Sequence, residues 1–167
     1  MGGTHDLARV RGRRHNERMR VALYRPEIAF NVGGVLRLGA CMDVGIDLIE
    51  PMGFVWDEQR VKRAAMDYIR HVEVTRHADW ATFAAQRSGR LVLMTTTAAD
   101  PLHGFAFAPD DVLLFGRESA GVPAEVHAAA DARVRIPMRA GLRSLNLAMS
   151  AGIALTEALR QTGGLPG

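Results

Sequence analysis

Three separated segments of the sequence place polar side chains beside glycines, each directly after an apolar run. In the first segment, Asn31 precedes Gly33, Gly34 and Arg37. We expect Asn31 to be the N-cap of a helix, because the backbone N–H groups that follow such a cap can hold an anion such as an RNA phosphate. The paired glycines cost helix stability and suit a place where a ligand or another backbone approaches closely. Arg37 follows the glycines by about one helical turn, within reach of a ligand bound at the start of the helix, although an exposed helix arginine is the simpler interpretation.

The second segment, residues 113–123, runs from an apolar stretch into a turn with Gly116 near its start, Glu118 inside it and Gly121 near its end. Gly116 would allow a flat ligand to lie against the backbone, because it has no side chain. Glu118 is either a site residue or an acid favoured at a helix start, which Pro123 marks. The segment predicts a ligand-binding turn at the end of a strand.

The third segment, residues 136–147, ends a strand at Pro137 and leads through a short loop into an apolar helix. Ser144 is the expected N-cap of that helix. Asn146 would then lie two residues inside the helix, where a buried amide needs hydrogen-bond partners. A ligand could supply those partners, so Asn146 is a candidate site residue.

Other catalytic signatures are absent from the sequence. No G-x-G-x-x-G follows a strand-like run, no glycine-rich loop ends in Gly-Lys-Ser/Thr, and no serine lies in a G-x-S-x-G turn. His71, Glu73 and His77 loosely suggest the H-x-E of a zinc deaminase, but the P-C-x-x-C half of that signature is missing. We therefore interpret these three residues as surface polar residues and expect no metal site.

The elements that must position the three segments alternate along the chain. Short apolar runs, mostly continuous as in strands that are buried on both faces, are followed by helix-like segments. This repeated order predicts an α/β fold, with a mostly parallel sheet and helices on both faces. The expected strands are Met19–Tyr24, Ile46–Glu50, His71–Thr75, Leu91–Thr95, Val112–Phe115 and Val134–Pro137, and the expected helices are Asn31–Met42, Asp57–Ala65, Ala78–Gln86, Pro123–Ala130 and Ser144–Gln161.

The last expected helix has apolar or small residues on all sides over residues 145–159. A helix with no polar face must be covered all round. The cover we expect is a second copy of the chain, because soluble oligomers are commonly symmetric dimers. A central helix within the core of one chain is the alternative.

Composition limits the class of protein further. The net charge is +3: residues 1–20 carry +4 and the remaining 147 residues −1, so the folded part is not basic overall. We expect the arginine-rich residues 1–18 to be a disordered tail ahead of one folded domain over residues 19–167. Arg63 belongs to one of two basic clusters in that domain that could contact RNA, with a solvated face as the alternative. We expect no secretion signal, because residues 1–20 are polar and arginine-rich, and no apolar run is long enough to span a membrane. The single cysteine, Cys41, fits a reducing compartment, so we expect a cytoplasmic protein.

The three segments together resemble the SPOUT class of RNA methyltransferases, with N-x-G…R at residues 31–37, F-G-x-E-x-x-G-x-P at 115–123 and I-P-M…S-x-N at 136–146. Residues 49–54 (Ile-Glu-Pro-Met-Gly-Phe), Trp56, and the stretches 61–64, 67–68 and 75–77 sharpen the match to the TrmL subgroup, which methylates the wobble ribose of certain tRNAs. The resemblance covers Arg20 to about Gly163, and the basic tail lies outside it.

This resemblance implies an S-adenosylmethionine-dependent 2′-O-methyltransferase that acts on tRNA. It implies a C-terminal trefoil knot, a rare exception to unknotted topology, and a homodimer through the knot and the last helix. Arg37 would be the catalytic arginine, which we expect to bind a phosphate beside the ribose, because arginine is essentially never deprotonated. The implied cofactor contacts are Met94, Gly116, Ile136, Ser144 and Leu145; the implied pocket residues are Asn31, Glu118, Ser144 and Asn146; and the implied RNA contacts are Arg37, Arg143 and Arg63.

Three other interpretations stay open from the sequence. The nearest is a SPOUT enzyme that acts on ribosomal RNA or on another tRNA position. A second is a non-catalytic RNA-binding relative, against which the joint presence of Arg37, Glu118, Ser144 and Asn146 counts. A third is a metabolite-binding α/β domain unrelated to RNA.

Overall fold

The computed structural model describes residues 18–98 and 100–167. The tail expected at residues 1–18 lies outside the described residues, apart from Arg18, which pairs with Asp43 at 3.0 Å. All the helices and strands given below lie within the described residues. The helices are α1 (Ala29–Met42), α2 (Glu58–Ala65), α3 (Trp80–Gln86), α4 (Ala124–Ala129) and α5 (Leu147–Thr162), with 3₁₀ helices η2 (Met66–His71) and η3 (Leu102–Gly104).

The strands of the described residues form one seven-stranded sheet in the order β3-β2-β1-β6-β4-β7-β5, and every neighbouring pair is parallel. The parallel order confirms the expected fold class. It also brings the carboxyl ends of all strands to one edge of the sheet, where open α/β sheets bind ligands. The strands are β1 (Arg20–Tyr24), β2 (Gly45–Ile49), β3 (Val74–His77), β4 (Leu91–Met94), β5 (Asp100–Pro101), β6 (Val112–Phe115) and β7 (Ala132–Arg135).

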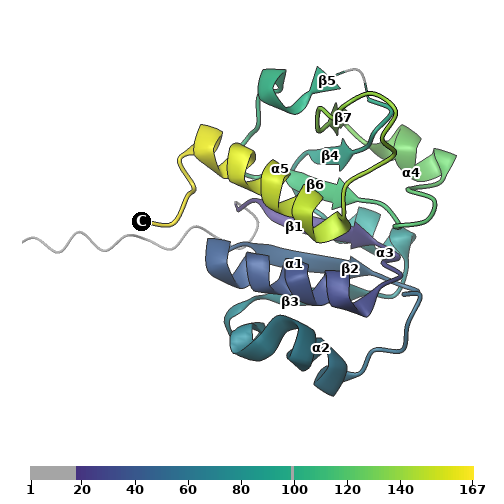
Figure 1. The fold of residues 1–167 in the computed structure, drawn as a ribbon, viewed down its shortest axis with the longest axis vertical. Helices are drawn as coiled ribbons and strands as arrows, with labels where there is room; N and C mark the ends of the chain where they lie inside the picture. The colour runs from purple at the N-terminus through teal and green to yellow at the C-terminus, as the bar shows by residue number, and fades with distance from the viewer. Residues whose placement is uncertain (1–17, 99) are drawn as a thin grey trace, which may run out of the picture.

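Helices cover both faces of the sheet because alternate strand residues point to opposite sides. Along β1, Val21 and Leu23 pack with α1, α2 and α5 in one apolar cluster, whereas Ala22 and Tyr24 pack with Phe83 of α3 and with α4 in a second. Figure 1 shows α1 and α5 side by side across one face. They approach closely at Gly34, where an added Cβ would lie 3.1 Å from the Cβ of Ala148, so this glycine serves helix packing.

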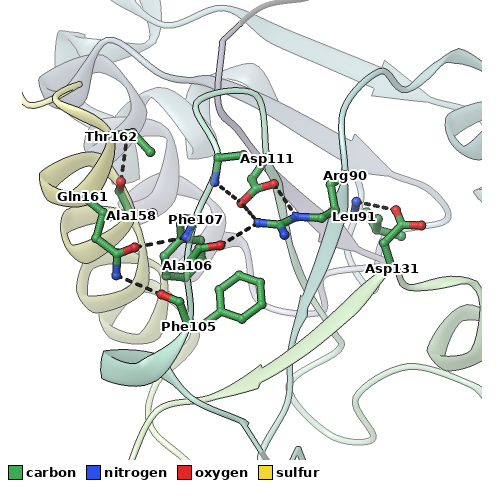
Figure 2. A network of polar contacts seen from close by, with 11 residues as sticks. Arg90, Leu91, Phe105, Ala106, Phe107, Asp111, Asp131, Ala158, Gln161 and Thr162 are labelled. Carbon is green, nitrogen blue, oxygen red and sulfur yellow. Dashed lines mark hydrogen bonds and ion pairs between the residues drawn. The ribbon is translucent and has the colours of Figure 1, made fainter.

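A polar network fastens the C-terminal part of α5 to the amino ends of β4 and β6 (Figure 2). Arg90 donates to both carboxylate oxygens of the fully buried Asp111, at 2.9 Å from Nε and 2.8 Å from Nη2. Gln161 of α5 accepts from the Phe107 N–H at 3.0 Å and donates to the Phe105 carbonyl at 3.0 Å. These bonds satisfy backbone groups of a segment that belongs to no strand or helix.

Several expected boundaries are wrong by a few residues. Strand β3 begins at Val74 rather than His71, because η2 extends through His71. Strand β7 covers Ala132–Arg135 and ends before Pro137. The short strand β5 and both 3₁₀ helices were not expected. None of the described helices is long and apolar enough to cross a bilayer.

Candidate active site

A cavity of about 440 Å³ lies at the carboxyl edge of the sheet, where the three segments singled out in the sequence meet. Such a volume is typical of a small-molecule site. Its walls come from the ends of β4 and β6 with the turn after β6, the loop after β7, the start of α5, and the residues around the start of α1. The lining residues include Ile28, Asn31, Met94, Thr95, Thr96, Gly116, Arg117, Glu118, Ser119, Gly121, Ile136, Met138, Ser144, Leu145, Asn146 and Ser150.

The turn after β6 closes tightly on itself. Arg117 and Gly121 exchange backbone hydrogen bonds of 2.9 Å in both directions, and Gly121 has a positive φ of 61°. A Cβ on Gly116 would lie 2.6 Å from the backbone carbon of Gly121. Gly116 is therefore required by the close approach of its own turn, in addition to the room for a flat ligand that was expected from the sequence.

Glu118 uses its carboxylate to hold the beginning of α1. Its Oε2 accepts from the Glu27 N–H at 2.8 Å, and its Oε1 accepts from the Ile28 N–H and from Asn31 Nδ2, both at 3.2 Å. Both oxygens therefore already have donors. We infer that Glu118 shapes the cavity wall and is not placed to accept a proton from a substrate.

Asn31 and Asn146 differ from their expected roles in the helices. Helix α1 begins at Ala29 with Ile28 as its N-cap, so Asn31 lies inside the first turn, buried to 5 % exposure. Asn146, not Ser144, is the N-cap of α5: its Oδ1 accepts from the N–H groups of Ala148 at 2.9 Å and Met149 at 3.3 Å. Its Nδ2 donates to Asn31 Oδ1 at 2.9 Å. The hydrogen-bond partners of Asn146, which a ligand was expected to be able to supply, are therefore protein groups.

Ser144 lies in an exposed loop two residues before the cap and lines the cavity together with Leu145. Met94, at the end of β4, and Ile136, just after β7, also line the cavity. All five expected cofactor-contact residues are thus brought to one cavity.

The three expected arginines lie elsewhere. Arg37, Arg63 and Arg143 are exposed and are not among the described residues that line the cavity. Arg37 projects from α1 with its guanidinium 4.8 Å from the ring centre of Tyr68, which is cation–π range. The structure therefore separates the proposed catalytic arginine from the cavity of its own chain.

Glu27 and Ser119 were not expected from the sequence to be site residues. Glu27 Oε1 accepts from Ser119 Oγ at 2.7 Å, and Oε2 accepts from the Ser119 N–H at 2.8 Å. These hydrogen bonds, with a smaller contribution from the charge of Arg117, lower the pKa of Glu27 below its ordinary value. No local pattern links two residues so far apart in the chain; only their positions after the neighbouring strands β1 and β6 could have suggested the pair.

The expectation for the polar residues around β3 is partly wrong. His71 and Glu73 are exposed, but His77 is buried to 5 % exposure, with Nε2 2.8 Å from Asp47 Oδ1. Asp47 also accepts from Arg20 Nε at 2.7 Å. Among the described residues no group of three or more His, Cys, Asp and Glu side chains is arranged to bind a metal ion.

The cavity can therefore bind a compact molecule that has both apolar surface and polar edges. Leu93, Met94, Phe115, Ile136 and Leu147 supply apolar walls. Polar contacts would come from the backbone and hydroxyl groups of the surrounding turns, because the carboxylate of Glu118 is already occupied. The adenosine, sulfonium and amino-acid parts of S-adenosylmethionine fit this mixture, and backbone groups can bind an adenine edge while apolar side chains cover its faces.

Comparison with known proteins agrees with this geometry. Residues 18–156 match the model of the SpoU rRNA Methylase family. A tRNA (cytidine(34)-2′-O)-methyltransferase of Beijerinckia indica is 51 % identical over 148 residues, which cover 87 % of this chain and 92 % of that protein.

Two solved structures are similar throughout the described fold. A structure reported under "Structural insights into the 2-OH methylation of C/U34 on tRNA" superposes with a TM-score of 0.82 at 38 % identity and covers 87 % of this chain and 97 % of that chain. An AdoMet-bound rRNA methyltransferase from Sinorhizobium meliloti has a TM-score of 0.79 at 28 % identity over 87 % of this chain and 57 % of that one.

Proposed function

Because this chain belongs to the SpoU rRNA Methylase family, we propose that it transfers a methyl group from S-adenosylmethionine to the ribose 2′-hydroxyl of the wobble nucleotide of a tRNA. The observation that carries the proposal is the convergence of three sequence-distant turns on one cavity. The 51 % identity to a tRNA (cytidine(34)-2′-O)-methyltransferase over nearly the whole of both chains favours tRNA over ribosomal RNA as the substrate.

The cavity residues would hold the cofactor. Met94, Gly116, Ile136, Ser144 and Leu145 would contact it, with Glu118, Asn31 and Asn146 fixing the shape of the wall around it. S-adenosylmethionine supplies an electrophilic methyl group on a sulfonium. The protein contributes position: it holds the ribose oxygen in line with that methyl group and excludes water.

Arg37 would act on the RNA rather than on the cofactor. It lies outside the cavity, and its guanidinium is a permanent cation suited to a phosphate oxygen. A phosphate held beside the target ribose would orient the 2′-hydroxyl and stabilise negative charge that develops on its oxygen. Arg143 and Arg63, both exposed, would bind the RNA backbone.

We further propose that the enzyme is a cytoplasmic homodimer through α5. Met149 and Ile153 of this helix are 61 % and 43 % exposed, and Leu145 ahead of it is 37 % exposed. A second copy would cover this apolar face, and it offers a way to bring an arginine of one chain near the cavity of the other.

The test is incubation of the protein with bulk tRNA and methyl-labelled S-adenosylmethionine, followed by mapping of the labelled nucleotide. We expect label on the ribose of the wobble nucleotide. Label at another tRNA position, or on ribosomal RNA only, would make the chain a methyltransferase of different specificity. Cofactor binding without transfer to any RNA would make it a non-catalytic relative.

A further inference from the structure

We propose that Glu27 and Ser119 are positioning residues, which clasp the start of α1 to the turn after β6 and so fix the relative position of two parts of the cavity wall. The link between this clasp and methyl transfer rests on the proposed function. The clasp itself rests on the hydrogen bonds between the two segments.

Each of the two segments contributes a carboxylate that accepts hydrogen bonds from the other segment. Glu27 accepts two hydrogen bonds from Ser119, from the backbone N–H at 2.8 Å and from Oγ at 2.7 Å. In the opposite direction, Glu118 accepts from the backbone N–H groups of Glu27 at 2.8 Å and Ile28 at 3.2 Å. Each carboxylate thus binds the backbone of the segment that carries the other one.

The clasp begins where the sheet stops. The pairing of β1 with β6 ends at Leu23 and Phe115, and beyond these residues the two segments leave the sheet. Beyond that pair, the two carboxylates provide the charge-assisted bonds that keep the segments together. Hydrogen bonds to a charged acceptor are stronger than those between neutral groups.

A third loop confines Glu27 from the other side. The N–H of Gly53, in the loop after β2, donates to the Pro26 carbonyl at 2.9 Å. A Cβ on Gly53 would lie only 2.8 Å from the Glu27 Cα, which is backbone and cannot turn aside. A methyl group at residue 53 would therefore displace the clasp without removing any of its polar groups.

The position of the clasp links it to ligand binding. Ile28 and Asn31 line one part of the cavity, and Gly116 through Val122 line the part that adjoins it, where Glu118 accepts from both Ile28 and Asn31. Glu27 and Ser119 join these two parts directly. Loosening the clasp would let the two parts move independently, and a ligand would have to order them on binding.

The experiment compares Glu27→Ala, Ser119→Ala, Ser119→Thr and Gly53→Ala with Glu125→Ala, a control at an exposed glutamate of the first turn of α4. Calorimetry measures the affinity of each protein for S-adenosylmethionine. Hydrogen exchange without cofactor follows the backbone amides of residues 26–31 and 116–121. Urea unfolding shows whether each variant is folded.

We expect Glu27→Ala to weaken cofactor binding about tenfold, the lower range for bonds to a charged group. Ser119→Ala should weaken it by less, because the backbone N–H remains, and Ser119→Thr should recover most of that loss. Gly53→Ala should also weaken cofactor binding, as Glu27→Ala does. The double variant Glu27→Ala/Ser119→Ala should be no weaker than Glu27→Ala alone, because both remove one interaction. In Glu27→Ala, exchange should accelerate in both segments, although only one is mutated.

Two results separate the clasp from the function on which it rests. If the wild type fails to bind S-adenosylmethionine, the proposed function is wrong, and accelerated exchange in both segments would still support the clasp. If Glu27→Ala and Ser119→Ala bind and exchange as the Glu125→Ala control does, the clasp is wrong. Should Glu27→Ala not fold, the same comparison is made with Ser119→Ala, whose side chain is exposed.

Discussion

Asn31 joins two of the segments that form the cavity. Its amide nitrogen donates to Glu118 and its amide oxygen accepts from Asn146, so one buried side chain spans the turn after β6 and the cap of α5. An amide can do this because it carries a donor and an acceptor on the same group. A carboxylate at this position would face Glu118 without a proton to share, which explains why the site needs an amide here.

Arg37 is the residue on which the proposed chemistry depends most. We predict that Arg37→Ala abolishes methyl transfer to tRNA, a loss of at least about a hundredfold, because the phosphate beside the ribose loses its cation. The affinity for S-adenosylmethionine should stay near that of the wild type, since Arg37 does not line the cavity. Single-turnover transfer assays and calorimetry measure the two quantities.

Arg37→Lys is the matched control for this prediction. It keeps the positive charge but loses the planar fork of donors, and we expect partial activity. Wild-type turnover by Arg37→Ala would remove the residue from the mechanism.

At the scale of elements, α5 is held at both ends by polar contacts. Asn146 caps its beginning, and Gln161 near its end binds Phe105 and Phe107. Glu157, one turn earlier on α5, accepts from Arg160 Nε at 2.8 Å and from Gln161 Nε2 at 2.8 Å. These bonds, the one from Arg160 first, lower the pKa of Glu157 from 4.5 to about 2.

This shift predicts how stability depends on pH. A carboxylate whose pKa is lowered by folding stabilises the native state above its ordinary pKa, and that stabilisation is lost as pH falls through the folded value. We therefore expect the part of stability due to Glu157 to decline between pH 4.5 and about 2. Urea unfolding midpoints over this range should fall less for Glu157→Gln than for the wild type. Equal falls in the two proteins would contradict a role for this carboxylate.

At the scale of the whole molecule, the apolar face of α5 predicts the oligomeric state. Met149→Glu and Ile153→Glu should each weaken the proposed dimer by about a hundredfold, because a symmetric interface carries every substitution twice and each buried apolar side chain contributes about 1.5–3 kcal/mol. Analytical ultracentrifugation over a range of concentrations measures the dissociation constant.

Val55→Glu is the control for the dimer. Val55 is 86 % exposed in the loop after β2, so its substitution adds the same charge away from α5. A wild type that stays monomeric at high concentration would contradict the dimer. The trefoil knot that the sequence resemblance implies stays a prediction.

The sequence by itself determined the fold class and most of the cavity. Continuous apolar runs followed by helical patterns specify a parallel sheet, and a parallel sheet brings the turns after its strands to one edge. Gly116, Glu118 and Asn146 could therefore be singled out as candidate site residues without coordinates, and the resemblance to the SPOUT class added Met94 and Ile136 to the same site. These features are encoded locally, in residue type and spacing.

Only the tertiary structure decided which groups hold one another. Asn31 is not the cap of α1, His77 is buried against Asp47, and Glu27 binds a serine more than ninety residues away. Each of these depends on contacts between segments distant in the chain, and the pattern around a residue does not reveal which distant donor will reach it. The absence of Arg37 from the residues that line the cavity belongs to the same class, because its position in α1 does not by itself show which side chains reach the cavity.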